Sequence, residues 1–252
     1  MIFEVCCGCT EDAVNAAAGG ADRIELNSAL FLGGLTPSLG SLIEVKKAVS
    51  IPIMAMVRPR EGGFCYSDFD FNTILRDAEI LLSEGADGLV FGFLNPNGTV
   101  DVKRTEKLTE LCLKNDKEAV FSRAADVTPD IFEAVSILES IGVNRVLTSG
   151  AKPSAIEGKD VIKELKLCSH SIEILPGGGL RAGNVSDFVE FTGVNQVHAS
   201  ARSLRYDTSV NFNKEIYFGG SLGGAFLPEN EYKVTDVSLV REMKKIIDNI
   251  RS

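Results

Sequence analysis

Short apolar runs alternate with amphipathic segments along most of this 252-residue chain, and this alternation constrains the fold more than any other feature. The apolar runs have the length and β-branched content of buried strands, and the segments between them carry apolar residues at helical spacing. Strands that alternate with helices favour a parallel sheet with the helices packed against it. The predicted strands are Ile2–Cys6, Asp22–Leu26, Pro52–Val57, Gly88–Leu94, Glu118–Arg123, Asn144–Thr148, Ile172–Leu175 and Asn195–Ser200.

The position of a glycine-rich loop favours a closed barrel over an open sheet. Pro176-Gly177-Gly178-Gly179 follows the seventh predicted strand. No glycine fingerprint follows the first strand, where a dinucleotide-binding fold carries one. In (β/α)₈ barrels the loops after strands seven and eight commonly hold a phosphate, and 252 residues is a typical length for such a barrel. The sequence therefore predicts a single (β/α)₈ TIM-barrel domain over residues 1–252.

Two segments outside the strands carry further predictions. Thr128, followed by Pro129, is expected to cap the fifth helix, and Val237–Ile250 is expected to form the last one. A long insertion, about residues 201–234, separates the eighth strand from that last helix. It predicts a lid over the barrel mouth or a contact in a homo-oligomer, because it carries these apolar residues: Phe212, Tyr217, Phe218, Leu222, Phe226 and Leu227.

Charge and the start of the chain narrow the classes of function. The net charge of -9 argues against nonspecific binding to nucleic acid or to an anionic membrane surface. No apolar run approaches the ~18 residues of a membrane span. Met1–Glu4 begins directly as a strand, without the basic and apolar regions of a signal peptide. We therefore expect a cytoplasmic protein with no nucleic-acid or membrane partner, in which most cysteines are reduced.

Side chains at the carboxyl ends of barrel strands predict a site for a small anionic ligand. Consecutive glycines let the N–H groups of Gly178 and Gly179 approach a ligand, and a helix starting just beyond adds the positive end of its dipole. Ser200, at the end of the eighth strand, would meet a phosphate. Three arginines leave strands toward this face as bidentate donors: Arg58, Arg60 and Arg123. The alternative is that they pair with acidic loop residues such as Glu61 and Asp126.

Charged residues inside the predicted strands need partners in the barrel interior. Glu4 on the first strand can point inward, and Arg23 and Glu25 share one side of the second. These residues predict an internal ion-pair network, whose alternative role is only to fill the barrel. Glu25 is the candidate catalytic acid or base, with Arg123 as its partner in catalysis. His198 is either a satisfied core residue or a ligand contact.

Characteristic segments follow one another in a recognisable order over most of the chain: Glu4–Cys6, Gly20–Leu26, Gly33–Ser38, Arg58–Arg60, Phe64–Asp68, Arg145–Gly150, Pro176–Gly179 and His198–Arg202. Together they resemble the CutC family, long associated with copper homeostasis. The resemblance implies a (β/α)₈ barrel and a copper-homeostasis role with Cu(I) bound near Cys6. Two positions depart from the family pattern. Asn27 stands where a cysteine usually ends strand two, and Ser122 where a histidine usually ends strand five.

The cysteines determine how such a copper site would be built. Cu(I) prefers thiolate and thioether ligands, and Cys6 ends the first predicted strand. Adjacent strand residues point to opposite faces, so Cys7 is a poor partner for Cys6. Cys9, or Cys65 from the loop after the third strand, is the better second metal ligand. The alternative is that Cys6 is a small packing residue without a ligand.

Two functions therefore stay open at the level of sequence. The first is a copper homeostasis protein of the CutC type that binds Cu(I) through Cys6. The second is an enzyme that acts on a small anionic or phosphorylated metabolite at the carboxyl face of the barrel, with the anion held by arginines and glycines.

Overall fold

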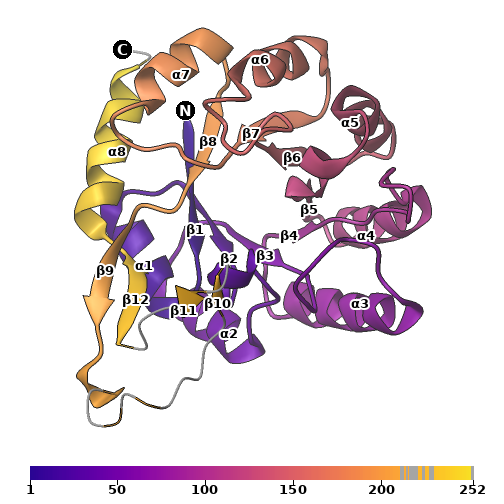
Figure 1. Ribbon diagram of the computed structural model, residues 1–252. Coiled ribbons are helices and arrows are strands. Elements are labelled where there is room, and N and C mark those ends of the chain that lie inside the picture. Colours follow the sequence, from indigo (N-terminus) through magenta and orange to yellow (C-terminus); the bar gives the residue numbers. More distant parts are fainter. Residues whose placement is uncertain (211–212, 214, 216–220, 223–224, 227–229, 251–252) are drawn as a thin grey trace.

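In the computed structural model, eight parallel strands form a barrel that helices surround (Figure 1). The structure describes residues 1–252 apart from 211–212, 214, 216–220, 223–224, 227–229 and 251–252, and apart from the side chains of 221–222 and 225–226. The barrel strands are β1 Ile2–Cys7, β2 Arg23–Leu26, β3 Ile53–Met56, β4 Gly88–Phe91, β5 Glu118–Phe121, β6 Arg145–Thr148, β7 Glu173–Pro176 and β8 Gln196–Ala199. Each lies within or close to a predicted strand.

The order of the strands confirms the predicted (β/α)₈ barrel. Neighbours in the sheet follow the chain from β1 to β7, and β8 pairs with the other edge of β1. The barrel closes between β7 and β8 through a parallel bridge of Gly177 with His198. Closure leaves the eight-stranded sheet of the barrel without a free edge, and it sets the glycine-rich loop after β7 directly beside the end of β8.

Amphipathic helices cover the outside of the barrel, as the spacing of apolar residues predicts. In α3, for example, Ile74, Ala78 and Leu81 are buried, and the helix begins with a capping box between Ser67 and Asp70. The helices are α1 Thr10–Gly19, α2 Leu39–Ala48, α3 Asp68–Ser83, α4 Val102–Lys114, α5 Ile131–Ser140, α6 Lys159–Cys168, α7 Val185–Thr192 and α8 Val237–Asn249. None of these described helices combines the length and apolar character needed to cross a membrane.

The predicted start of the fifth helix is wrong by a few residues. Thr128 does not cap it, because its hydroxyl donates back to the carbonyl of Ala125 at the end of a 3₁₀ helix, η2 Arg123–Val127. The carboxylate of Asp130 caps α5 instead and accepts from the N–H groups of Phe132 and Glu133. A carboxylate two residues further on satisfies the free N–H groups of the first helical turn directly.

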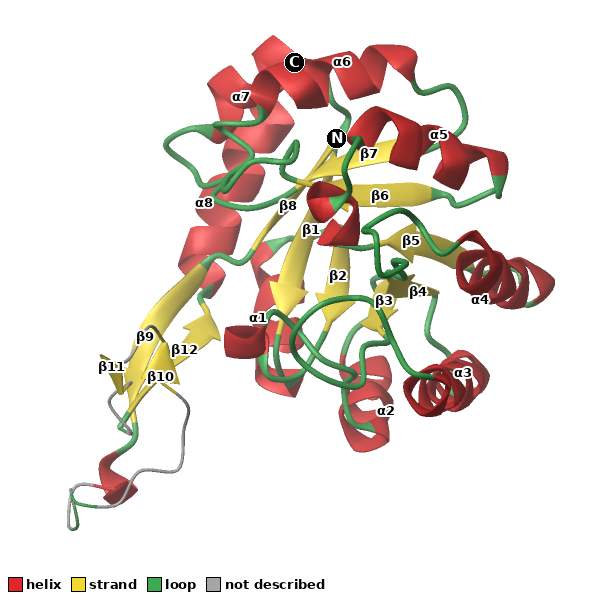
Figure 2. Ribbon diagram, turned by 45° about the vertical axis from the view of Figure 1, so that its right-hand side comes forward, coloured by secondary structure: helices red, strands yellow, loops and turns green. Residues whose placement is uncertain are grey.

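The insertion after β8 leaves the barrel as a two-stranded ribbon (Figure 2). β9 Arg202–Tyr206 pairs antiparallel with β12 Glu231–Thr235, and the short strands β10 Ser221–Leu222 and β11 Ala225–Phe226 lie between them in sequence. Asp12 on α1 anchors the ribbon, since its carboxylate accepts from the N–H of Thr235. The apolar side chains that predict a lid or oligomer contact all lie outside the described part: Phe212, Tyr217, Phe218, Leu222, Phe226 and Leu227.

A polar network fills the amino-terminal half of the barrel interior. The predicted ion pair between Glu4 and Arg23 is present and buried. Hydrogen bonds and ion pairs continue from it around the barrel through six strands, by way of Glu4, Arg23, Gln196, Glu173, Arg145 and Glu118. Glu25, the third predicted member, joins this network through His198, whose ring nitrogens lie 2.8 Å from Glu4 and 3.9 Å from Glu25. It lies one layer higher on β2, opposite Cys6 in the register with β1, and therefore faces the carboxyl end of the barrel.

Candidate functional site

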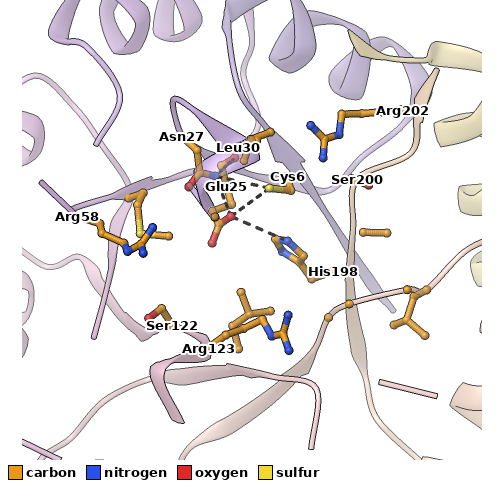
Figure 3. Close-up of a pocket in the computed structure, with 18 of the residues that line it drawn as sticks. Cys6, Glu25, Asn27, Leu30, Arg58, Ser122, Arg123, His198, Ser200 and Arg202 are labelled. Carbon is orange, nitrogen blue, oxygen red and sulfur yellow. Dashed lines mark hydrogen bonds and ion pairs between the residues drawn. The ribbon is translucent and has the colours of Figure 1, made fainter. Parts of the chain in front are cut away.

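A cavity of about 440 Å³ opens where the barrel strands end. Side chains from several strand ends line it, and Figure 3 shows them converging from opposite sides of the barrel. Of the predicted site residues, the lining includes Cys6, Glu25, Arg58, Arg123, Gly178, Gly179, His198 and Ser200. Leu30, Met56, Phe64 and Leu147 supply apolar walls. This is the end of a (β/α)₈ barrel at which active sites form.

Three side chains that can bind metal meet in this cavity. Sγ of Cys6, a carboxylate oxygen of Glu25 and a ring nitrogen of His198 all lie within 4.8 Å of one another. The Cys6 thiol donates to Oε2 of Glu25 at 3.3 Å, and Nε2 of His198 lies 3.9 Å from the same oxygen. In the described part of the chain, no other group of three His, Cys, Asp or Glu residues is gathered in this way. We call these residues the Cys6–Glu25–His198 cluster.

Glu4 fixes the orientation of the histidine in this cluster. Its Oε1 lies 2.8 Å from Nδ1 of His198, while its other oxygen pairs with Arg23. Burial alone would raise the pKa of Glu4, but the hydrogen bond from His198 and the charge of Arg23 outweigh it and hold the pKa at about 2. With Nδ1 turned to Glu4, Nε2 is the ring nitrogen that faces Glu25 and can serve as a ligand.

The same surroundings shift the pKa of His198 and of Cys6. Burial alone would lower the pKa of His198, but the carboxylates of Glu25 and Glu4 outweigh it and raise that pKa. Burial, followed by the negative charge of Glu25, raises the pKa of the Cys6 thiol well above its ordinary value. Cys6 is therefore a neutral thiol at physiological pH, and a metal ion has to displace its proton.

The predicted arginines divide into three different environments. Arg58 lines the cavity, but its guanidinium donates to the carbonyls of Leu32, Gly34 and Gly62 and so braces the loops. Arg60 does not reach the cavity, and its predicted role there is wrong. It pairs with Asp70 at 3.2 Å, because the carboxylate that caps α3 lies beside the loop.

Arg123 combines both alternatives that the sequence left open. Its Nε pairs with Asp126 at 2.8 Å, as the ion-pair alternative predicts, and the residue still lines the cavity. Two further arginines line the cavity and were not predicted: Arg181 and Arg202. Arg181 lies just beyond the glycine loop and Arg202 just beyond strand eight, and these positions in the sequence could have predicted both.

Neither expected thiol partner of Cys6 lies in the cavity. Cys9 is exposed at the start of α1, because the chain turns outward at Gly8 after β1. Cys65 is exposed in the loop after β3 and lines a separate cavity of about 480 Å³ together with Arg60. The predicted grouping of Cys6 with Cys9 or Cys65 is therefore not found, and the side chains that lie beside Cys6 are those of Glu25 and His198.

Comparison with known proteins places this chain in a family. Residues 1–203 match the CutC family. The chain belongs to the CutC family. It is 49% identical to a CutC family protein of Treponema denticola over 98% of each chain. It is 42% identical to a human protein named copper homeostasis protein cutC homolog, over 99% of this chain and 90% of that one.

A solved structure of a CutC protein shares this architecture. The crystal structure of CutC from Streptococcus agalactiae superposes with a TM-score of 0.74 at 30% identity, and covers 79% of this chain and 98% of that one. Family membership, predicted from short sequence segments, and the barrel, predicted from the alternation of strands and helices, are thus confirmed.

In this CutC protein Asn27 stands at a position where the family resemblance predicts a cysteine. Its Nδ2 donates to Oε2 of Glu25 at 2.8 Å and lies 3.6 Å from Sγ of Cys6. Asn27 therefore orients two members of the cluster through a single amide. Ser122, at the second departure, lines the cavity and caps η2 by accepting from the N–H of Ala124.

Proposed function

We propose that this protein acts in copper homeostasis by binding one Cu(I) ion at the Cys6–Glu25–His198 cluster. The observation that carries the proposal is the convergence of a thiol, an imidazole and a carboxylate from β1, β8 and β2 within 4.8 Å. Thiolate and imidazole are ligands that suit copper. The names of the human and mouse relatives, which are copper homeostasis protein cutC homologs, support the same function.

Each residue of the cluster has a different role in holding the ion. Cys6 supplies the thiolate, and Glu25, which already accepts the thiol proton, is placed to take that proton away. Nε2 of His198 supplies the second ligand, because Glu4 holds Nδ1 on the opposite side of the ring. Asn27 keeps Glu25 beside the sulfur through its amide hydrogen bond.

Copper affinity is expected to rise with pH. The raised pKa of Cys6 keeps the thiol protonated in the free protein, so each bound ion releases at least one proton. Release of one proton strengthens binding about tenfold for each unit of pH between 6 and 8. The raised pKa of His198 adds a further proton at the acidic end of this range, where the free imidazole is protonated.

Anaerobic titration with Cu(I) against a competing chelator measures this dependence, with the chelator's own pH dependence measured in parallel. The proposal predicts one ion per chain and a dissociation constant that falls with each pH step. An affinity that stays constant from pH 6 to 8, or a stoichiometry other than one ion per chain, would contradict binding through the Cys6 thiol.

A further inference from the structure

The cavity is strongly cationic, although the chain as a whole is acidic. The net charge is -9, yet four arginines and a single carboxylate line the cavity: Arg58, Arg123, Arg181, Arg202 and Glu25. Low-dielectric walls focus the field of such a group into the cavity, which concentrates anions there. The copper site explains Cys6, Glu25 and His198 but gives the arginines no role.

Arg123 is held in place as an anion-binding group would be. Its Nε pairs with Asp126 at 2.8 Å, and its Nη2 donates to Oγ of Ser149 at 2.5 Å. Asp126 is itself fixed by the N–H groups of Ser149 and Ala151 at 2.9 Å and 3.0 Å. Nη1 is left beside the glycine loop, since a Cβ atom on Gly178 would stand 3.6 Å from it.

The glycine loop presents donors next to this guanidinium. Gly178 and Gly179 have φ angles of +97° and +84°, a conformation that favours glycine and turns successive N–H groups toward one side. In the described part of the chain neither N–H has an acceptor, whereas the N–H of Gly177 is bonded to Thr148. The carbonyl of Gly178 accepts from Ala155, which fixes the loop.

Arg181 and Arg202 add two positive charges that have no acidic partner among the described residues. Within the described residues, neither guanidinium makes a hydrogen bond or ion pair, although both line the cavity. Figure 3 shows Arg202 on the side of the cavity that holds Ser200 and Cys6. Arg202 begins β9, so the ribbon that leaves the barrel after β8 brings this arginine to the cavity.

The cavity is larger than an inorganic anion needs. Its volume of about 440 Å³ extends from the glycine loop to the Cys6–Glu25–His198 cluster, between the apolar side chains of Met56 and Leu147. A ligand that fills it therefore joins an anionic group to an organic body.

We propose that this cavity binds a small organic phosphate monoester. The phosphate contacts the N–H groups of Gly178 and Gly179 and the guanidinium groups of Arg123 and Arg181, and the organic body points past His198 toward Cys6 and Arg202. This ligand site goes beyond the copper proposal and does not depend on it, because its phosphate contacts use none of the copper ligands.

Calorimetric titration of the copper-free protein tests this proposal with inorganic phosphate and with glycerol 3-phosphate, and glycerol serves as the uncharged control. Arg181→Gln, just beyond the glycine loop, removes a charge that has no partner to lose, and Arg123→Gln is the second variant. Arg76→Gln, on the exposed face of α3, is the matched control. Each cavity variant is expected to raise the dissociation constant of inorganic phosphate at least about tenfold, the loss of a charged hydrogen bond.

The expected result is saturable binding of phosphate, displaced by glycerol 3-phosphate and not by glycerol, and weakened in both cavity variants but not in Arg76→Gln. Cys6→Ser should bind phosphate as the wild type does, which separates this site from the copper site. The proposal is overturned if no phosphate compound saturates the wild type, if glycerol 3-phosphate does not displace phosphate, or if both cavity variants bind like Arg76→Gln.

Discussion

Cys6→Ser is expected to weaken Cu(I) binding by more than about a hundredfold. Removal of a group that only orients a metal ligand costs 10–100-fold in affinity, and loss of the single thiolate in the cluster exceeds that range. The fold should survive, because a serine hydroxyl is smaller than the thiol and can donate to Glu25 in its place. Competition with a Cu(I) chelator under anaerobic conditions measures the change.

Two other cysteines provide matched controls for this experiment. Cys9 and Cys65 are exposed and lie outside the cavity, so Cys9→Ser and Cys65→Ser should each retain wild-type affinity. Equal losses in Cys9→Ser and Cys6→Ser would show that copper binds exposed thiols. Full affinity in Cys6→Ser would show that copper does not bind at the Cys6–Glu25–His198 cluster.

Glu4→Gln is expected to lower the free energy of unfolding by about 3–5 kcal/mol at pH 7, the cost of breaking a buried ion pair on one side. The substitution leaves Arg23 and His198 without the carboxylate that they share, and both lie in the barrel interior. Urea denaturation measures the change. Glu44→Gln is the control, because Glu44 pairs with Lys47 on the surface and should cost less than about 0.5 kcal/mol.

Wild-type stability against pH provides a second measurement of the same network, should Glu4→Gln fail to fold. The pKa of Glu4 is about 2 in the folded chain and 4.5 ordinarily, so its contribution of about 3 kcal/mol is present above pH 4.5 and lost as pH falls toward 2. His198 has a raised pKa, so its contribution is present below about 6.5 and is lost as pH rises through the folded value. A profile flat below pH 4.5 would contradict the network.

The barrel and part of its interior could be predicted because they depend on local pattern. Apolar runs of the right length identify strands, and alternation along a strand fixes which side chains point inward. Glu4 and Arg23 were therefore predicted as partners, and Cys6 and Glu25 were placed near the carboxyl face. Cys6 and Glu25 come together with His198 only because β8 pairs with β1. That pairing joins the first strand of the barrel to the last.

The loops could not be predicted because their paths depend on distant contacts. Arg60 turns away from the cavity because the cap of α3 supplies Asp70 as a nearer partner. Arg202 enters the cavity because β9 pairs with β12, where the partner of Arg202 is the distant residue Thr235. No periodicity in sequence encodes either contact.

X-ray absorption at the copper edge, recorded on the Cu(I)-loaded protein and on Cys6→Ser, tests the central claim most directly. Copper bound at the cluster should have one sulfur neighbour together with nitrogen or oxygen neighbours, and the sulfur should disappear in Cys6→Ser. A sulfur-only environment in the wild type, or a sulfur neighbour that persists after Cys6→Ser, would show that copper binds elsewhere on this chain.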